Sequence, residues 1–158
     1  MSIDVTTRPD VTDAKRLFAI VASKFNGRFV QGLVDNATNE LRSLAPEATI
    51  TNYEVPGAFE IPVVVREIAM TRKVDAVLAL GVILKGSTSH AEHLSHSVTN
   101  ALQQVALEYG VPVINAVLGL ENEQQAQERC LGDRINRGVE AAQAAVEVTN
   151  VLARLRAN

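Results

Sequence analysis

The chain has 158 residues, a length at which one hydrophobic core usually closes, so we expect a single domain over residues 1–158. Hydrophobic residues make up 47% of the chain but aromatic residues only 4%, which predicts a core of Ala, Val, Ile and Leu suited to helices packed on a buried sheet. The formal net charge is -3 and the basic residues are scattered, which argues against a nucleic-acid partner.

Two features bear on the compartment. Residues 1–16 are polar without an apolar signal region, and the longest apolar run, residues 76–84, is too short to span a bilayer. The single cysteine, Cys130, has no partner within the chain for a disulfide, and we expect it to be a small buried or semi-buried side chain. These features predict a cytoplasmic protein without a membrane segment.

Apolar periodicity and turn residues predict an alternation of strands and helices. The expected elements are a strand at 17–23, a helix from 28 to about 44 with Asn26 as its cap, a strand at 49–55, a helix from 60 to about 72, a strand at 75–84, a helix from 90 to about 109, a strand at 113–118, a short helix at about 121–130 and a long helix at 139–155. This alternation predicts an α/β fold with a parallel sheet between two helix layers.

The final helix is apolar over a wider arc than contact with one sheet requires. Its apolar residues are Ala141, Ala142, Ala144, Ala145, Val146, Val148, Val151 and Leu152. We therefore expect this helix to contact other subunits.

In an open parallel sheet a ligand lies beyond the carboxyl ends of the strands, so the loops that follow the strands are expected to form the site. In the loop after the third strand, Gly86, Ser87 and Thr88 precede a helix, and their amides and hydroxyls are suited to bind phosphate. The alternative is an ordinary loop in which Ser89 caps the helix. The glycine-rich patterns of nucleoside triphosphate and dinucleotide sites are absent.

The only histidines are His90, His93 and His96. Side chains three residues apart diverge by about 60° around a helix, so a shared metal ion is disfavoured, and we expect His93 and His96 to be solvated or at an interface. His90 follows the candidate phosphate loop, where a side chain that exchanges protons near neutral pH suits acid–base catalysis. A purely structural role for His90 is the alternative.

Four other side chains are ambiguous when taken singly. Glu60 is either an acidic residue at a helix N-terminus or a ligand for substrate hydroxyl groups. Phe25 and Phe59 are either core anchors or surfaces on which a planar ring stacks. Arg129, by itself, is an ordinary solvated helix charge.

Together, these loops closely resemble those of lumazine synthases. The matching motifs are VPGAFEIP at 55–62, ALGVI at 79–83, KGSTSH at 85–90, EQQAQER at 123–129 and NRGVEAA at 136–142. The match runs from about Leu17 to the C-terminus, and several motifs in order are far more specific than any one of them.

The resemblance implies a four-stranded, flavodoxin-like sheet. It also implies a homopentamer, or a multiple of pentamers up to an icosahedral capsid, with active sites between subunits. Residues 1–15 would form an arm that packs on a neighbouring subunit, and riboflavin synthase is a candidate partner.

The implied reaction is the penultimate step of riboflavin biosynthesis. It condenses 5-amino-6-(D-ribitylamino)uracil with 3,4-dihydroxy-2-butanone 4-phosphate to 6,7-dimethyl-8-ribityllumazine, with release of phosphate and water. Every step is a proton transfer or a charge stabilisation, so neither a cofactor nor a metal is expected.

The resemblance also implies a role for each candidate residue. The pyrimidine and its ribityl chain would be bound by Phe25, Ala58, Phe59, Glu60, Val82, Ile83, Leu84 and Asn115. The phosphate would be bound by Gly86, Ser87, Thr88 and Arg129, the last from the adjacent subunit. His90 and Arg129 would be the catalytic residues, with His90 moving protons.

The chain departs from the family pattern at several positions. Ala91 and His93 stand where aromatic residues usually flank an acid, and Asn115 replaces another usual aromatic, which bears on ring affinity. The altered bend before the last helix leaves pentamers, decamers and a shell open. The other replacements are Lys85, Leu131, Ile135 and Arg137.

Two other classes of function are alternatives. A non-catalytic flavin or lumazine binder would need Phe25 and Glu60 but neither His90 nor Arg129, so the presence of both favours an enzyme. A flavodoxin-like regulatory or electron-transfer domain would carry an acidic cluster or a flavin phosphate loop after the first strand. The residues there, KFNG at 24–27, provide neither.

Overall fold

The computed structural model describes residues 7–86 and 88–157. Its elements, in chain order, are β1 (Leu17–Ser23), α1 (Gly27–Leu44), β2 (Thr49–Val55), the 3-10 helix η1 (Ala58–Glu60), α2 (Ile61–Thr71), β3 (Ala76–Leu84), α3 (His90–Tyr109), β4 (Val113–Leu120), α4 (Glu123–Ala126), the π-helix η2 (Gln127–Leu131) and α5 (Arg137–Arg156).

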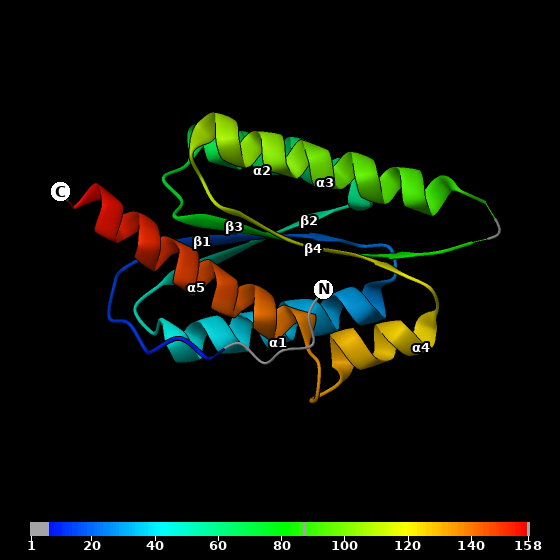
Figure 1. Ribbon diagram of the computed structural model, residues 1–158, viewed down its shortest axis with the longest axis horizontal. Coiled ribbons are helices and arrows are strands. Elements are labelled where there is room, and N and C mark those ends of the chain that lie inside the picture. The colour runs from blue at the N-terminus through cyan, green and yellow to red at the C-terminus, as the bar shows by residue number, and fades with distance from the viewer. Residues whose placement is uncertain (1–6, 87, 158) are drawn as a thin grey trace.

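The four strands form one sheet in the order β2-β1-β3-β4, and every neighbouring pair is parallel. Helices α1, α4 and α5 lie on one face of the sheet and α2 and α3 on the other (Figure 1). This confirms the predicted α/β fold with a parallel sheet between two helix layers. The strand order is that of flavodoxin-like folds without a fifth strand.

Strand β1 shows how the sheet separates two apolar cores. Phe18 and Ile20 pack with α1 and α5, whereas Ala19 and Val21 pack with α2 and α3, because successive side chains of a strand point to opposite faces. The central strand β3 is buried along almost its whole length, as its continuous apolar run predicts. Both cores are built mainly from Ala, Val, Ile and Leu, as the composition predicts.

Three predicted elements differ most from the structure, and the other boundaries differ by one residue or less. Strand β4 continues to Leu120 instead of ending at 118, because β3 reaches Leu84 and offers a hydrogen-bonding partner to the last residues of β4. Helix α5 begins at Arg137 instead of 139, since Asn136 caps it by accepting a hydrogen bond from the Val139 amide at 3.1 Å. The short helix expected at 121–130 is two pieces, α4 and the π-helix η2.

Asn26 occupies the N-cap position of α1, as predicted, and its carbonyl accepts from the Val30 amide at 3.1 Å, but its side chain does not take part in the cap. Asn26 has left-handed backbone angles (φ 58°, ψ 42°) and makes no side-chain cap hydrogen bond. Its amide nitrogen instead donates to the carbonyl of Val82 on β3 at 2.8 Å. A left-handed conformation turns the chain sharply from β1 into α1, and Asn tolerates it better than most residues.

The described part of the N-terminal arm lies against α1 of the same chain. The Arg8 guanidinium donates to both carboxylate oxygens of Glu40 at 3.1 Å, and the Thr12 amide donates to the Leu44 carbonyl at 2.8 Å. The hydrogen bond from Arg8 lowers the pKa of the Glu40 carboxyl. Residues 1–6 of the arm lie outside the described residues.

Two further expectations concern Cys130 and α5. Cys130 is fully buried, as predicted, and burial raises the pKa of its thiol to about 11.

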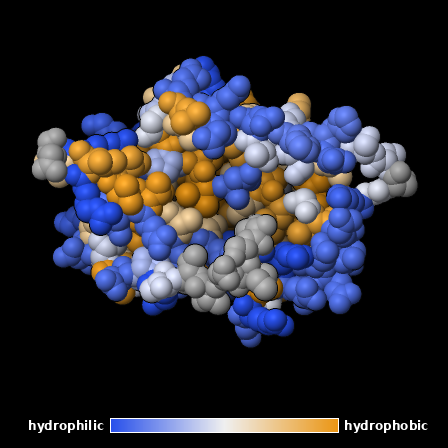
Figure 2. Space-filling model, in the orientation of Figure 1, coloured by the Kyte–Doolittle hydropathy of each residue, from blue (hydrophilic) through white to orange (hydrophobic). Residues whose placement is uncertain are grey.

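On α5, Ala142 and Ala145 are buried, but Val151 and Leu155 leave 42% and 69% of their surface exposed. Figure 2 shows further apolar surface in a band between the two helix layers. Among the residues that the structure describes, no helix is long and apolar enough to cross a membrane.

Candidate functional site

The loops at the carboxyl edge of the sheet converge, as predicted. The loop after β1 is tied to the end of β2, because the Lys24 amide donates to the Val55 carbonyl at 2.9 Å and the Phe25 amide to the Pro56 carbonyl at 3.2 Å. The loop after β3 is tied to the end of β4 by a bond from the Lys85 amide to the Leu120 carbonyl at 2.9 Å. All four strand ends therefore meet at one edge.

Phe25, Gly57 and Glu60 form the most compact part of this edge. A Cβ atom at Gly57 would lie 2.8 Å from Cδ2 and Cε2 of the Phe25 ring, so a larger residue there would displace the ring from this position. The Gly57 amide donates to Oε1 of Glu60 at 2.9 Å. The arrangement sets an aromatic face beside a half-buried carboxylate.

Phe25 and Phe59 are not core anchors, the first alternative for these residues. They leave 66% and 68% of their surface exposed. Exposed aromatic rings at one sheet edge are suited to stack on a planar ligand or to contact another subunit. Ala58, between Gly57 and Phe59, is buried.

The end of β3 supplies backbone more than side chains. Val82 is buried in the core that contains α1 and α5, and Ile83 in the core that contains α2 and α3, while Leu84 is half-buried. The Asn26 amide bonds the Val82 carbonyl and so holds the Phe25 loop against β3. We did not predict this contact. An Asn-Gly pair directly after an aromatic residue is the sequence signal for such a turn.

His90 is the first residue of α3 and is exposed beside the candidate phosphate loop. Its backbone amide lies 3.4 Å from the Thr88 hydroxyl. Gly86 and Thr88 are exposed, and Ser89 occupies the N-cap position of α3 without a side-chain cap hydrogen bond. Ser87 lies outside the described residues.

Other charged and histidine side chains lie on the elements next to this loop. Lys85 pairs with Glu121 at 2.8 Å, and this hydrogen bond raises the pKa of the lysine. His93 and His96 are exposed on α3. Within residues 7–86 and 88–157, no three His, Cys, Asp or Glu side chains gather closely enough to hold a metal ion.

Arg129 and Asn115 belong to η2 and β4, elements that do not carry Phe25 or Glu60. Arg129 is half-buried on η2, and its Nη1 atom is buried without a hydrogen-bond partner among the described residues. Asn115 pairs in register with Ala79, five residues before the end of β4 at Leu120, so it lies roughly 16 Å below the strand end. Within one chain Asn115 is therefore separated from Phe25, which follows β1.

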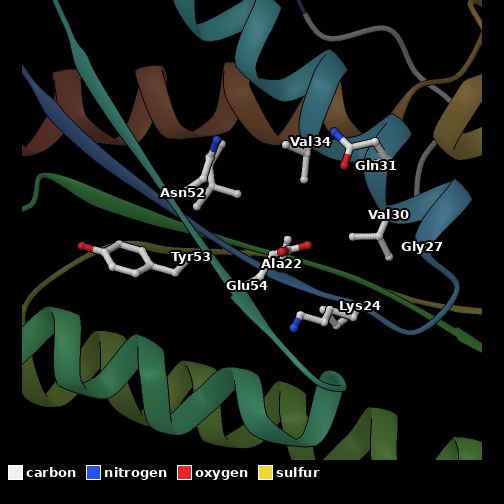
Figure 3. A pocket seen from close by; sticks show the side chains of 11 residues that line it. Ala22, Lys24, Gly27, Val30, Gln31, Val34, Asn52, Tyr53 and Glu54 are labelled. Atoms are coloured by element: carbon white, nitrogen blue, oxygen red, sulfur yellow. The ribbon is translucent and has the colours of Figure 1, made fainter.

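A pocket of about 480 Å³ lies between the start of α1 and the edge strand β2 (Figure 3). Its lining includes Lys24, Gln31, Asn52 and Glu54, and none of the predicted site residues. The predicted residues instead surround an open edge of the sheet.

Comparison with known proteins matches these observations. The model of the 6,7-dimethyl-8-ribityllumazine synthase family matches residues 15–153. A 6,7-dimethyl-8-ribityllumazine synthase of Chlorobium limicola is 43% identical over 135 residues, which cover 85% of this chain and 87% of that protein. The structure also matches a de novo designed Rossmann fold protein with a TM-score of 0.41 and 15% sequence identity. This match covers 72% of this chain and 91% of the designed protein, and it is too distant to bear on function. The chain belongs to the 6,7-dimethyl-8-ribityllumazine synthase family.

Proposed function

We propose that the chain catalyses the cofactor-free condensation of 5-amino-6-(D-ribitylamino)uracil with 3,4-dihydroxy-2-butanone 4-phosphate to 6,7-dimethyl-8-ribityllumazine, the penultimate step of riboflavin biosynthesis. Family membership over most of the chain supports this reaction. The structural observation that carries it is the exposed Phe25 ring over Gly57 beside Glu60, at the same sheet edge as His90. We also propose a cytoplasmic location, with which a single buried thiol agrees.

In this proposal the aminopyrimidine ring stacks on Phe25. The carboxylate of Glu60 accepts hydrogen bonds from ribityl hydroxyl groups, and Ala58 and Phe59 line the same loop. The end of β3, at Val82, Ile83 and Leu84, borders the ring. Asn115 would reach the ring only from a neighbouring subunit, since its own chain holds it at the far edge of the sheet.

The phosphate of the ketose would lie at Gly86, Ser87 and Thr88, next to the N-terminus of α3. Peptide amides at a helix N-terminus and the helix dipole favour an anion there. Arg129 of the adjacent subunit would complete this site.

The chemistry needs little besides positions and protons. An amine of the pyrimidine attacks the ketone and an imine forms with loss of water. Phosphate is then eliminated, and the second nitrogen closes the ring on the remaining carbonyl with loss of a second water. His90 exchanges protons with the reacting groups, while Arg129 and the α3 N-terminus stabilise charge on the departing phosphate.

Purified protein mixed with both substrates tests the function directly. We expect lumazine fluorescence to rise and one phosphate to be released per product, with neither signal when one substrate is omitted. Tight binding of lumazine or riboflavin without any turnover would contradict the proposal and support the non-catalytic binder instead.

We further propose that the protein assembles at least into homopentamers, with active sites between subunits. Large apolar side chains are exposed on three helices, including Val63 on α2, Leu107 on α3 and Leu155 on α5. Surfaces of this kind are usually covered by neighbours. Residues 1–15 would contact a neighbour in part, and riboflavin synthase would be a candidate partner of a closed capsid.

The assembly has its own test. Light scattering at micromolar concentration is expected to give the mass of a pentamer or a multiple of it, and electron microscopy of fresh protein distinguishes a ring from a sixty-subunit shell. A monomer under these conditions would contradict the shared active site.

A further inference from the structure

The π-helix η2, which carries Arg129, needs support from elsewhere in the fold. π-helical turns are rare and are kept only where the surrounding structure favours them. η2 has five residues, Gln127–Leu131, and the chain leaves it directly into the bend before α5. The contacts that hold its last turn therefore decide where Arg129 lies.

Asn136 connects the end of η2 to the first turn of α5. Its side chain is buried, with 8% of the residue exposed. The amide nitrogen donates to the carbonyls of Cys130 at 3.3 Å and Gly132 at 3.0 Å, and the amide oxygen accepts from the Val139 amide at 3.1 Å. One carboxamide thus bonds both the end of η2 and the first turn of α5. Aspartate lacks the two donors, and serine is too short to reach both sides.

Helix α1 holds the same carbonyl from the other side. The amide nitrogen of Asn36 lies 3.4 Å from the Cys130 carbonyl oxygen and 2.8 Å from that of Gly32. A Cβ atom at Gly32 would lie 2.7 Å from the Cys130 oxygen, so only glycine allows η2 to pack this closely. Because Cys130 directly follows Arg129, fixing its carbonyl fixes the backbone from which the arginine projects.

We propose that Asn136 is a positioning residue for Arg129. It holds η2 so that the guanidinium stays in place to bind the phosphate group in the site of the neighbouring subunit. The inference rests on the proposed function, in which Arg129 is the phosphate ligand. This role differs from that of an ordinary helix cap, since capping α5 requires only the side-chain oxygen of Asn136.

The test uses Asn136→Asp in the assembled enzyme. Aspartate keeps the shape of asparagine and the oxygen that accepts from Val139, but it turns an acceptor toward the carbonyls of Cys130 and Gly132. The KM for the ketose phosphate should rise about three- to tenfold, as expected for one or two lost hydrogen bonds. The KM for the aminopyrimidine should stay within about twofold, because Asn136 bonds none of the residues proposed to bind that substrate.

Thr149→Val is the matched control. Thr149 is buried in the same helix and donates to the carbonyls of Ala145 or Val146, away from η2. It should lower Tm without changing either KM. If Asn136→Asp also lowers Tm only, Asn136 is a structural cap and the inference is wrong. If Asn136→Asp does not fold, Asn36→Ala can be tested instead, because it leaves the α5 cap intact. The KM of Asn36→Ala for the ketose phosphate should rise by a smaller factor. An unchanged KM would overturn the inference.

A double-mutant cycle with Arg129→Ala separates the two levels of the proposal. If Asn136 acts through Arg129, adding Asn136→Asp to Arg129→Ala should raise the KM for the ketose phosphate no further. A rise in KM for Arg129→Ala with no change for Asn136→Asp would overturn only the positioning role. An unchanged KM for Arg129→Ala would overturn the phosphate role of Arg129 and the inference with it.

Discussion

Replacement of His90 by alanine is expected to lower kcat by about 10² and to leave the KM of both substrates nearly unchanged. General acid–base groups typically contribute about 10² to 10⁴ in rate, and the loss should lie at the low end because the amine is itself a good nucleophile. His90 is exposed at the start of α3, so its loss removes a proton carrier without opening a core. Steady-state kinetics with each substrate varied in turn measures both effects.

His93→Ala is the matched control, because His93 is also exposed on α3, one turn further along the helix. Its kcat should equal that of the unchanged protein. A second comparison uses Phe25→Ala, which should raise the KM of the aminopyrimidine by removing the stacking surface. Full turnover in His90→Ala together with abolished turnover in Phe25→Ala would mean that catalysis is positioning alone.

Arg129→Ala should raise the KM of the ketose phosphate well over tenfold, because one charge-assisted contact to an oxyanion contributes about 1.5 to 3 kcal/mol. Arg129 is half-buried with an unpartnered Nη1 atom among the described residues, whereas Arg134, in the following bend, is exposed. Arg134→Ala is therefore the control, with an expected KM close to that of the unchanged protein. Equal KM values in the two variants would refute the phosphate role.

The same variant tests whether sites are shared. Subunits carrying Arg129→Ala can be mixed with subunits carrying Glu60→Ala and reassembled. If Arg129 serves the site of its neighbour, some interfaces in the hybrid will contain both intact residues, and part of the activity should return. No recovery in hybrids verified by mass spectrometry would show that Arg129 and Glu60 do not meet across an interface.

The strands and helices could be predicted because each rests on a local pattern. The continuous apolar run of β3 predicts a strand covered on both faces, and the spacing of apolar residues in α1 predicts a helix with one buried face. The parallel sheet follows from their alternation. The loops of the candidate site follow in turn, because the carboxyl ends of parallel strands must meet at one edge.

The parts that could not be predicted depend on contacts between distant residues. Asn26 bonds a carbonyl 56 residues away, and Asn36 approaches one 94 residues away, so neither partner is visible in a local window. Periodicity likewise does not distinguish the π-helix η2 from an α-helix, since the choice depends on how closely Gly32 lets α1 approach it.

The sequence by itself determined the fold class, the order of the elements and the loops in which the chemistry must lie, because apolar spacing and turn residues act locally. Only the tertiary structure decided that Phe25 lies over Gly57, that Asn136 joins η2 to α5, and that Asn115 is far from Phe25 within one chain. The physical reason is that close packing and buried hydrogen bonds select among side chains that are remote in sequence, and no local preference specifies which of them will meet.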